Sequence, residues 1–573
     1  FASFDEANRL LRQGASRLVL TGPSGVGKTA TAEKLLASRR PDATVLSGSC
    51  SKPLGEPTPF EPFREALEAH FELEAYTRDN VQAQHEQIAS MLDGVFESFV
   101  PFVSMLSPPL ESSTSGADSR HEVFRAVTLA LRQIATRRPV YLFIDDLQWA
   151  DADSIDLLRH LLEEFPPDSD DPVHFLFACR TDESEDLSDT LPENDWDGTD
   201  LTDHVVELSP PTKEQQIKIL TSSLGLKSTA ATQIVRRVDT EGPGSRGQLF
   251  WLFEVVRHLA QNSILRAPDD RSPNGTTEGS PSTEGFALSD SFDTGNFPVP
   301  TQFQAVIGEE LEEHPRYRMP LAYAACLGQT FRASTLTEIL GQSRFEILSL
   351  LRDIEQDTGW IRDVQSKDDV YEFSSSYLLE GMREHFEIQE AGPTDAAPQL
   401  IREYHAQAAR ALETVETEIG ESQRDQIANH YYAAGASHAE RAYQACLSAS
   451  RAMQSIYSFE QAQTFLDKAQ DCADVAGLDR ELEEESLRLT CFEAHIRGSV
   501  SLDEDETVLQ KAVEKGMAYL DCADAPSLET VRAVAQVCYD LARSTRDDKL
   551  AEQVIDWGRY LVEHSDSPVI QAE

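Results

Sequence analysis

The residues with the clearest chemical meaning form one short segment near the start of the chain. Gly22–Thr29 reads G-P-S-G-V-G-K-T, directly after the apolar Leu18–Leu20 and before the helical pattern of Ala30–Ala37. Glycines let backbone N–H groups surround a phosphate, lysine places a cation at the β- and γ-phosphates, and threonine can bind Mg²⁺. An ordinary glycine-rich turn does not require these glycines, the lysine and the threonine in one fixed spacing. The segment therefore predicts a site for ATP or ADP with Mg²⁺. The predicted binding residues are Gly22, Pro23, Ser24, Gly25, Val26, Gly27, Lys28 and Thr29.

A nucleotide site of this kind also needs a carboxylate at the end of a buried strand. The apolar Val140–Ile144 is followed by Asp145 and Asp146. We expect Asp145 to hold hydrated Mg²⁺ and Asp146 to orient or deprotonate the attacking water. Because aspartate has a shorter reach than glutamate, hydrolysis is predicted to be slow. Asp151 and Asp153 lie in a polar turn, where capping of the next helix competes with a role in the site.

A third polar position follows the apolar segment His174–Cys179. Arg180 stands at the tip of this predicted strand, from where it could contact the γ-phosphate beside the carboxylates. It is therefore a candidate sensor of the γ-phosphate. The alternative is an ordinary surface arginine that pairs with Asp182 or Glu183.

Short apolar segments that alternate with amphipathic helical patterns must position these residues within the first domain, residues 1–208. Such alternation is typical of a parallel sheet covered by helices, the sheet of a P-loop ATPase core. The predicted strands are Arg17–Thr21, Thr44–Ser47, Val140–Asp145 and His174–Cys179.

The remainder of the chain has helical patterns with one polar interruption. Residues 209–265 predict a small helical lid. Residues 266–297 are crowded with Ser, Thr, Gly, Pro and Asp, and predict a disordered insert because few apolar side chains offset the ordering entropy. Helices followed by a β-hairpin predict a winged helix over 298–390, and Ala-rich paired helices predict a TPR-like α-solenoid over 395–573. The predicted fold class is a multidomain α/β plus α protein.

The composition limits the remaining classes of function. The 573 residues predict three to five domains, and 50 Lys and Arg against 99 Asp and Glu give a net charge of −49. This charge repels phosphate backbones and anionic lipids, which argues against general binding of nucleic acids.

The sequence also bears on the compartment. No apolar run approaches the ~20 residues of a membrane helix, so no membrane partner is expected. Eight scattered cysteines without a C-x-x-C pair argue against a zinc site or a disulfide framework, and favour reduced thiols in the cytoplasm. The start at Phe1, with neither a methionine nor a signal segment, suggests a piece of a longer chain.

Further motifs resemble those of a known family. Asp145–Asp151 reads D-D-L-Q-W-A-D, very close to the D-D-L-H-W-A-D signature of the STAND signalling ATPases, an AAA-type group found beside helical repeats in bacterial regulators. Pro59–Leu67 resembles the family's P-Y-x-P-x-x-E-A-L segment, and Gly247–Leu252 resembles its lid motif G-N-P-F-F-L. The stretches that resemble its winged helix and first repeat are Pro300–Leu311, Ala324–Phe331, Tyr371–Glu380, Asn429–Tyr431 and Ala433–Gly435.

The resemblance implies a switch that is controlled by ATP and ADP. In this family ADP keeps the lid and winged helix folded over the P-loop domain, whereas ATP favours an open form that self-associates and activates an attached effector. An effector domain on the same longer chain is therefore implied, together with a protein or small-molecule ligand on the helical repeats. Leu249 replaces the lid proline, so if that proline packs against the adenine, the contact with the base is remade by Leu249 or lost. Ser375 stands where relatives have a histidine, which implies weaker retention of ADP.

Two other classes of protein compete with the switch. A nucleotide-binding scaffold without turnover would keep Lys28 and Asp145, and would differ only in its kinetics. An origin-recognition type of DNA-loading ATPase shares the AAA core and the winged helix but needs a basic face. The predicted winged helix and its flanks are acidic instead, at Glu309, Glu310, Glu312, Glu313, Asp353, Glu355 and Asp357.

Overall fold

The computed structural model describes most of the chain. The described residues are 2–50, 58–73, 86–88, 90–91, 120–181, 204–241, 249–261, 264–266, 286–288, 303–364, 369–389, 391–395, 397–419, 423–456, 458–478, 481–500, 506–522, 526–545 and 548–564.

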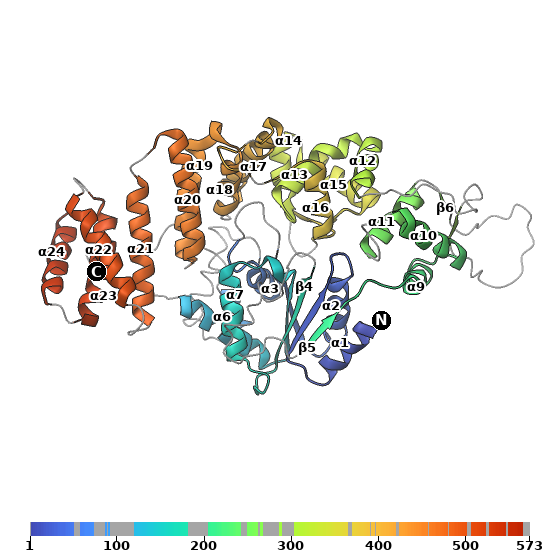
Figure 1. Cartoon of the computed structure of the whole chain (residues 1–573), viewed down its shortest axis with the longest axis horizontal. Coiled ribbons are helices and arrows are strands. Elements are labelled where there is room, and N and C mark those ends of the chain that lie inside the picture. Colours follow the sequence, from blue (N-terminus) through green and yellow to red (C-terminus); the bar gives the residue numbers. More distant parts are fainter. Residues whose placement is uncertain are drawn as a thin grey trace, which may run out of the picture.

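A five-stranded parallel sheet forms the centre of the N-terminal domain (Figure 1). Its strands are β1 (Arg17–Gly22), β2 (Thr44–Ser49), β3 (Val140–Asp145), β4 (Val173–Arg180) and β5 (His204–Glu207), in the order β2-β3-β4-β1-β5. The four predicted strands and the parallel sheet are thereby confirmed. Strand β5, which has four residues and is only partly buried, was not predicted from the sequence.

Helices cover both faces of this sheet because successive side chains of a strand point to opposite faces. Leu18 and Leu20 pack with α1 (Ala2–Arg12) and α2 (Lys28–Ala37). Val19 belongs to the core on the other face, with α3 (Glu61–Phe71), α6 (Arg120–Ala135) and α7 (Ala152–Glu164). Figure 1 shows the two groups of helices on the two sides of the sheet.

Three helices follow β5 in the region predicted as the lid. They are α9 (Lys213–Ser223), α10 (Ser228–Glu241) and α11 (Leu249–Gln261). The prediction that 266–297 is disordered throughout is wrong for its apolar triplet, residues 286–288. There β7 (Ala287–Leu288) pairs with β6 (Leu265–Arg266), and Phe286 exchanges backbone hydrogen bonds with the α9–α10 turn. Most of the predicted insert, 267–285 and 289–297, lies outside the described residues.

The next domain has the helices and the hairpin expected of a winged helix. Its helices are α12 (Phe303–Glu313), α13 (Arg318–Leu327), α14 (Ala333–Leu340), α15 (Arg344–Thr358) and α16 (Ser376–His385). Its strands are β8 (Thr330–Arg332), β9 (Ile361–Asp363) and β10 (Val370–Phe373), which form an antiparallel sheet in the order β8-β10-β9. Both predicted hairpin strands are therefore present.

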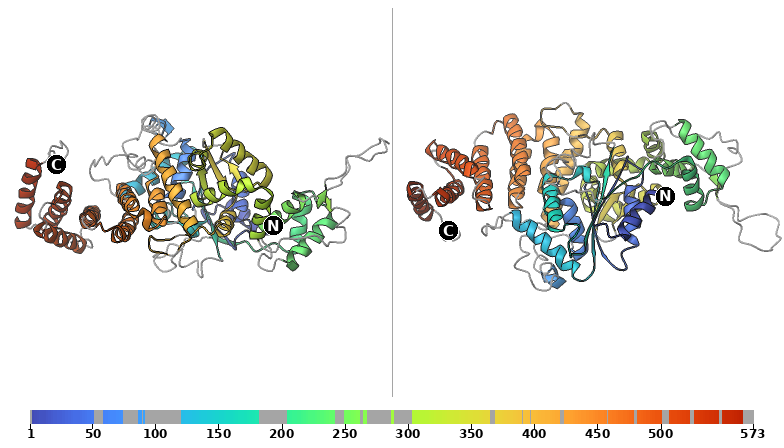
Figure 2. Two further views of the ribbon diagram at one scale, coloured as in Figure 1. Left: turned by 90° about the horizontal axis from the view of Figure 1, so that it is seen from above. Right: turned by 60° about the horizontal axis from the view of Figure 1, so that its bottom comes forward.

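The C-terminal region is helical, and each helix packs against the next. The helices are α17 (Gln399–Ile419), α18 (Arg424–Ala433), α19 (Ala439–Ser455), α20 (Phe459–Ala476), α21 (Glu481–Val500), α22 (Glu506–Cys522), α23 (Leu528–Thr545) and α24 (Asp548–His564). They extend to one end of the molecule, and the lid helices lie at the opposite end (Figures 1 and 2). Within the described parts of the chain, no helix combines the length and the apolar character needed to cross a membrane.

Candidate nucleotide-binding site

The carboxyl ends of three neighbouring strands bring the predicted residues to one edge of the sheet. β4 lies between β3 and β1, and Gly22 at the end of β1 is in register with Arg180 at the end of β4. Asp145 ends β3 and is in register with Ser49 at the end of β2. Ligands bind at this edge in open α/β sheets, so the topology places the candidate residues where a site is expected.

The segment Gly22–Thr29 forms a loop that leads into α2. Gly22, Gly25 and Gly27 have φ angles of 150°, 70° and 98°, which side chains with a Cβ rarely adopt. The Lys28 ammonium donates to the carbonyl oxygens of Gly22 at 2.9 Å and Pro23 at 3.1 Å. A buried cation over a glycine loop at a helix start is the arrangement that a polyphosphate requires.

Thr29 and Asp145 bring a hydroxyl and a carboxylate oxygen together beside the phosphate loop. The Thr29 hydroxyl donates to Asp145 Oδ2 at 2.6 Å. Burial, and after it the charge of Asp146, raises the pKa of the Asp145 carboxyl to about 7, while the contact with Thr29 lowers it. Carboxylate and hydroxyl oxygens suit Mg²⁺, so this pair fits the ion that accompanies ATP.

Asp146 and Arg180 are also brought together, and both contact the winged-helix domain. Arg180 Nε lies 3.4 Å from Asp146 Oδ1, and its guanidinium stacks over the Trp149 ring at 4.2 Å. The Ser376 hydroxyl donates to Asp146 Oδ2 at 3.1 Å and accepts from Arg180 Nη2 at 2.8 Å. Arg180 Nη1 also pairs with Glu380 Oε1 at 3.2 Å. Arg180 is 3% exposed, so it is not a surface residue in this structure.

Leu249 lies directly on the phosphate loop. Its backbone N–H donates to the Gly25 carbonyl at 3.0 Å, and a Cβ added at Gly27 would lie 3.6 Å from Leu249 Cδ1. The lid motif therefore contacts the loop, and Leu249 adjoins the region of a bound nucleotide. The role of Leu249 at the adenine stays a prediction.

Ser375, the position of the family's histidine, has a structural task. Its hydroxyl accepts from the Leu378 N–H at 3.1 Å and so caps the start of α16. The next residue, Ser376, makes the contacts with Asp146 and Arg180.

Asp151 and Asp153 have structural contacts outside the group of predicted nucleotide-binding residues. The Asp151 carboxylate accepts from the Ser154 N–H at 2.9 Å and caps α7, as the capping alternative predicted. Asp153 is 5% exposed and accepts a hydrogen bond from the Ser458 hydroxyl, at the start of α20.

Asp151→Asn is expected to raise stability at pH 8 but not at pH 4. Burial raises the pKa of Asp151 from 3.8 to about 6, so the folded state holds a proton that the unfolded chain releases between these values. The stability from this group is present below about pH 4 and is lost as the pH rises through about 6, by roughly 3 kcal/mol at most. Asparagine caps helices as well as aspartate does but carries no charge. Thermal melting at both pH values measures the difference, and an equal effect at both would contradict the charge explanation.

Four residues that position or contact the site were not predicted from the sequence. Glu65 Oε2 accepts from the backbone N–H and the hydroxyl of Ser49, both at 2.8 Å, and so fixes the strand end beside Asp145. Gln148 donates to Asp146 Oδ1 at 3.0 Å and accepts from the Arg180 N–H at 3.0 Å. Both lie inside the motifs quoted above, which was the available signal. Ser376 and Glu380 lie inside the stretch Tyr371–Glu380 that resembles the family's winged helix, but nothing in that stretch marked them as residues of the nucleotide site.

A match to a known protein family agrees with this geometry. Residues 5–176 match the family model of the AAA ATPase domain, and we conclude that this part of the chain is such a domain. No curated protein matches the chain.

Among solved structures, the chain is similar to a STAND protein with a tetratricopeptide repeat sensor from Pyrococcus horikoshii. It is 11% identical with a TM-score of 0.40, and the match covers 97% of this chain and 82% of that one. A Walker-type ATPase of Pyrococcus abyssi is 15% identical with a TM-score of 0.27, covering 66% and 95%. A Cdc6 protein from Pyrobaculum aerophilum is 14% identical with a TM-score of 0.27, covering 67% and 92%.

Proposed function

We propose that this chain is the ATP-binding and slowly hydrolysing switch of a larger signalling protein. In the proposed cycle the ADP state holds the winged helix on the AAA domain, and ATP releases it and permits self-association. Gly22–Thr29 would bind the phosphates, and Thr29 with Asp145 would hold Mg²⁺. An effector on the same protein would respond to the opening, and the helical repeats would bind a protein or small-molecule ligand.

The contact of Asp146 and Arg180 with α16 is the observation that carries this proposal. A γ-phosphate sensor and a water-orienting carboxylate must both face the nucleotide during hydrolysis. Here Asp146 accepts from Ser376, and Arg180 contacts Ser376 and Glu380. A γ-phosphate would compete with Glu380 for the Arg180 guanidinium, whereas ADP has no group at that position. The two nucleotides would therefore differ in affinity for the closed and open forms, which a switch requires.

Two further contacts hold the helical repeats against the AAA domain. The Thr58 hydroxyl donates to Asp425 Oδ2 at 2.7 Å, between the segment before α3 and α18. Ser458 donates to Asp153, and both side chains are buried. These contacts support a closed state in which a ligand on the repeats can shift the equilibrium of the AAA domain between its closed and open forms.

Glu380→Gln is expected to loosen the closed form. Loss of a hydrogen-bonded carboxylate beside the buried Arg180 removes about 1.5 to 3 kcal/mol, which shifts the closed-to-open ratio roughly 10- to 100-fold. ADP release and ATP hydrolysis should both become faster, and stopped-flow release of a fluorescent ADP together with phosphate release at saturating ATP measures them.

Glu384→Gln is the matched control, since Glu384 is exposed one turn further along α16 and the substitution removes the same charge. Equal rates for wild type and Glu380→Gln would overturn the proposed role of the α16 contact. Nucleotide binding without any turnover in all three proteins would instead favour the non-hydrolysing scaffold.

A further inference from the structure

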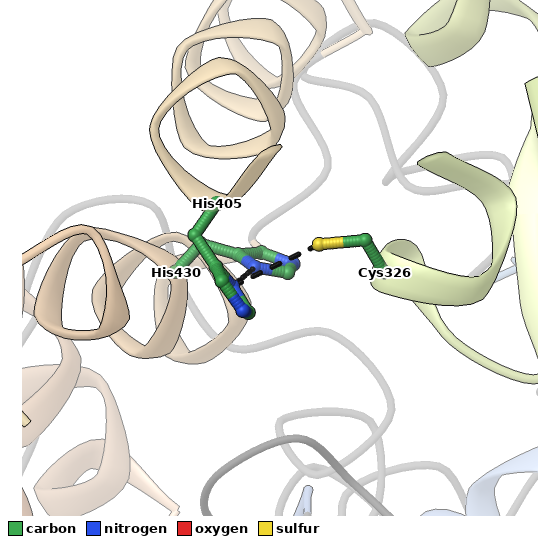
Figure 3. A group of neighbouring side chains, drawn as sticks. All are labelled: Cys326, His405 and His430. Carbon is green, nitrogen blue, oxygen red and sulfur yellow. Dashed lines mark hydrogen bonds between the residues drawn. The ribbon is translucent and has the colours of Figure 1, made fainter. Parts of the chain in front are cut away.

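Three side chains with metal-binding atoms meet where the winged helix contacts the first repeat helices. Cys326 comes from α13, His405 from α17 and His430 from α18 (Figure 3). Their exposed fractions are 1%, 1% and 4%, and their ligand atoms all lie within 4.8 Å of one another. This group is separate from the nucleotide site and has no part in the proposed hydrolysis.

Two contacts within the group share one nitrogen atom, His405 Nδ1. His405 Nδ1 lies 2.9 Å from His430 Nδ1 and 3.7 Å from Cys326 Sγ. A neutral imidazole nitrogen carries either one hydrogen or one lone pair, so His405 Nδ1 can make only one of these contacts as a good hydrogen bond. A cation placed among the three atoms would bind a lone pair from each.

We propose that Cys326, His405 and His430 bind one transition-metal ion of the zinc and copper(I) class. Zinc ligand bonds of about 2.0–2.1 Å to nitrogen and 2.3 Å to sulfur place tetrahedral ligands about 3.6 Å apart for S and N, and about 3.3 Å apart for N and N. The Cys326–His405 distance already matches. The two histidine nitrogens would separate by about 0.4 Å, within the reach of a side-chain rotation.

The chemistry of the three donors selects this class of ion. Thiolate and imidazole are ligands for zinc and copper(I), whereas Mg²⁺ and Ca²⁺ require oxygen atoms. His405 and His430 are both buried, and a neutral imidazole offers one nitrogen lone pair to a metal ion.

A nearby buried cation, Arg383, helps to distinguish between copper(I) and zinc. Arg383 on α16 donates to the carbonyl of Ala325, the neighbour of Cys326, at 3.1 Å. Its charge offsets that of a Cys326 thiolate, which favours a monovalent over a divalent ion. Among the described residues the group has three donors, which is enough for copper(I), whereas zinc would need a fourth ligand such as water.

A bound ion would fix the winged helix to the repeats. The three ligands join α13 to α17 and α18, and the ion would bind the folded arrangement only. The bound ion would therefore fix the position of the helical repeats relative to the winged helix, the domain that contains α16.

The test is a metal titration of the full chain after chelator treatment under reducing conditions. Zn²⁺ and, without oxygen, Cu⁺ are titrated separately against competing chromophoric chelators. We expect one ion per chain at this site, with affinity lowered more than about 100-fold by Cys326→Ala, because even changes outside the first ligand shell cost 10- to 100-fold. Cys538→Ala removes another fully buried cysteine and should leave the affinity unchanged.

A second measurement keeps the test decisive if Cys326→Ala does not fold. X-ray absorption of the metal-loaded wild-type protein should show one sulfur and two imidazole ligands. Equal affinity of wild type and Cys326→Ala, the absence of a bound ion with both metals, or a metal without a sulfur ligand would each overturn the proposal.

Discussion

Lys28→Ala is expected to abolish binding of ATP·Mg²⁺ at the concentrations at which the wild type is saturated. Lys28 is 6% exposed, and its ammonium lies 2.9 Å from the Gly22 carbonyl, at the mouth of the phosphate loop. Removing it deletes charge-assisted hydrogen bonds of about 1.5 to 3 kcal/mol each, so two such bonds to phosphate oxygens correspond to more than about 100-fold in affinity. Fluorescent-nucleotide titration or calorimetry gives the two dissociation constants.

The control for this change lies on the same helix. Lys34 is exposed on α2, and its ammonium lies 5.3 Å from the centre of the Phe4 ring. Lys34→Ala removes the same charge from the domain but should bind nucleotide as the wild type does. Equal nucleotide affinity of Lys28→Ala and the wild type would show that Gly22–Thr29 does not bind the phosphates.

Gly48→Ala should unfold the AAA domain at a markedly lower temperature. A Cβ at Gly48 on β2 would lie 1.8 Å from the carbonyl oxygen of Pro62 and 2.6 Å from its carbonyl carbon, at the start of α3. Both are backbone atoms, so no side-chain rotation relieves the overlap, and α3 must move away from the sheet. We expect a loss of about 3 kcal/mol or more, at the upper end of the cost of overpacking.

Gly558→Ala provides the comparison for Gly48→Ala. Gly558 lies within α24, and an added Cβ there would meet no atom within 4 Å. Alanine is the better helix former, so this variant should be as stable as the wild type or slightly more stable. Calorimetry of the three proteins checks both statements, and an unchanged melting profile for Gly48→Ala would show that α3 does not pack against β2 as described.

Local sequence motifs were enough to predict the phosphate loop and the position of Asp145. Gly22–Thr29 specifies its own loop, because glycine conformations and a helix start depend on neighbouring residues in the chain. The placement of Asp145 followed from an apolar strand that ends in a carboxylate. Strand β5 and the short β7 were missed because they are brief and lie in polar surroundings, where pairing with a distant strand outweighs local composition.

The sequence by itself determined the phosphate loop, the carboxylate at the end of β3, and the succession of parallel sheet, winged helix and helical repeats. The tertiary structure alone decided what Asp146 and Arg180 contact, because Ser376 and Glu380 lie 196 and 200 residues beyond Arg180. It also decided that Cys326 meets His405 and His430, although the spacing of the cysteines had argued against a zinc site. Such groups leave no pattern in the chain, because their members come from separate helices and meet only when the packing of whole domains buries them together.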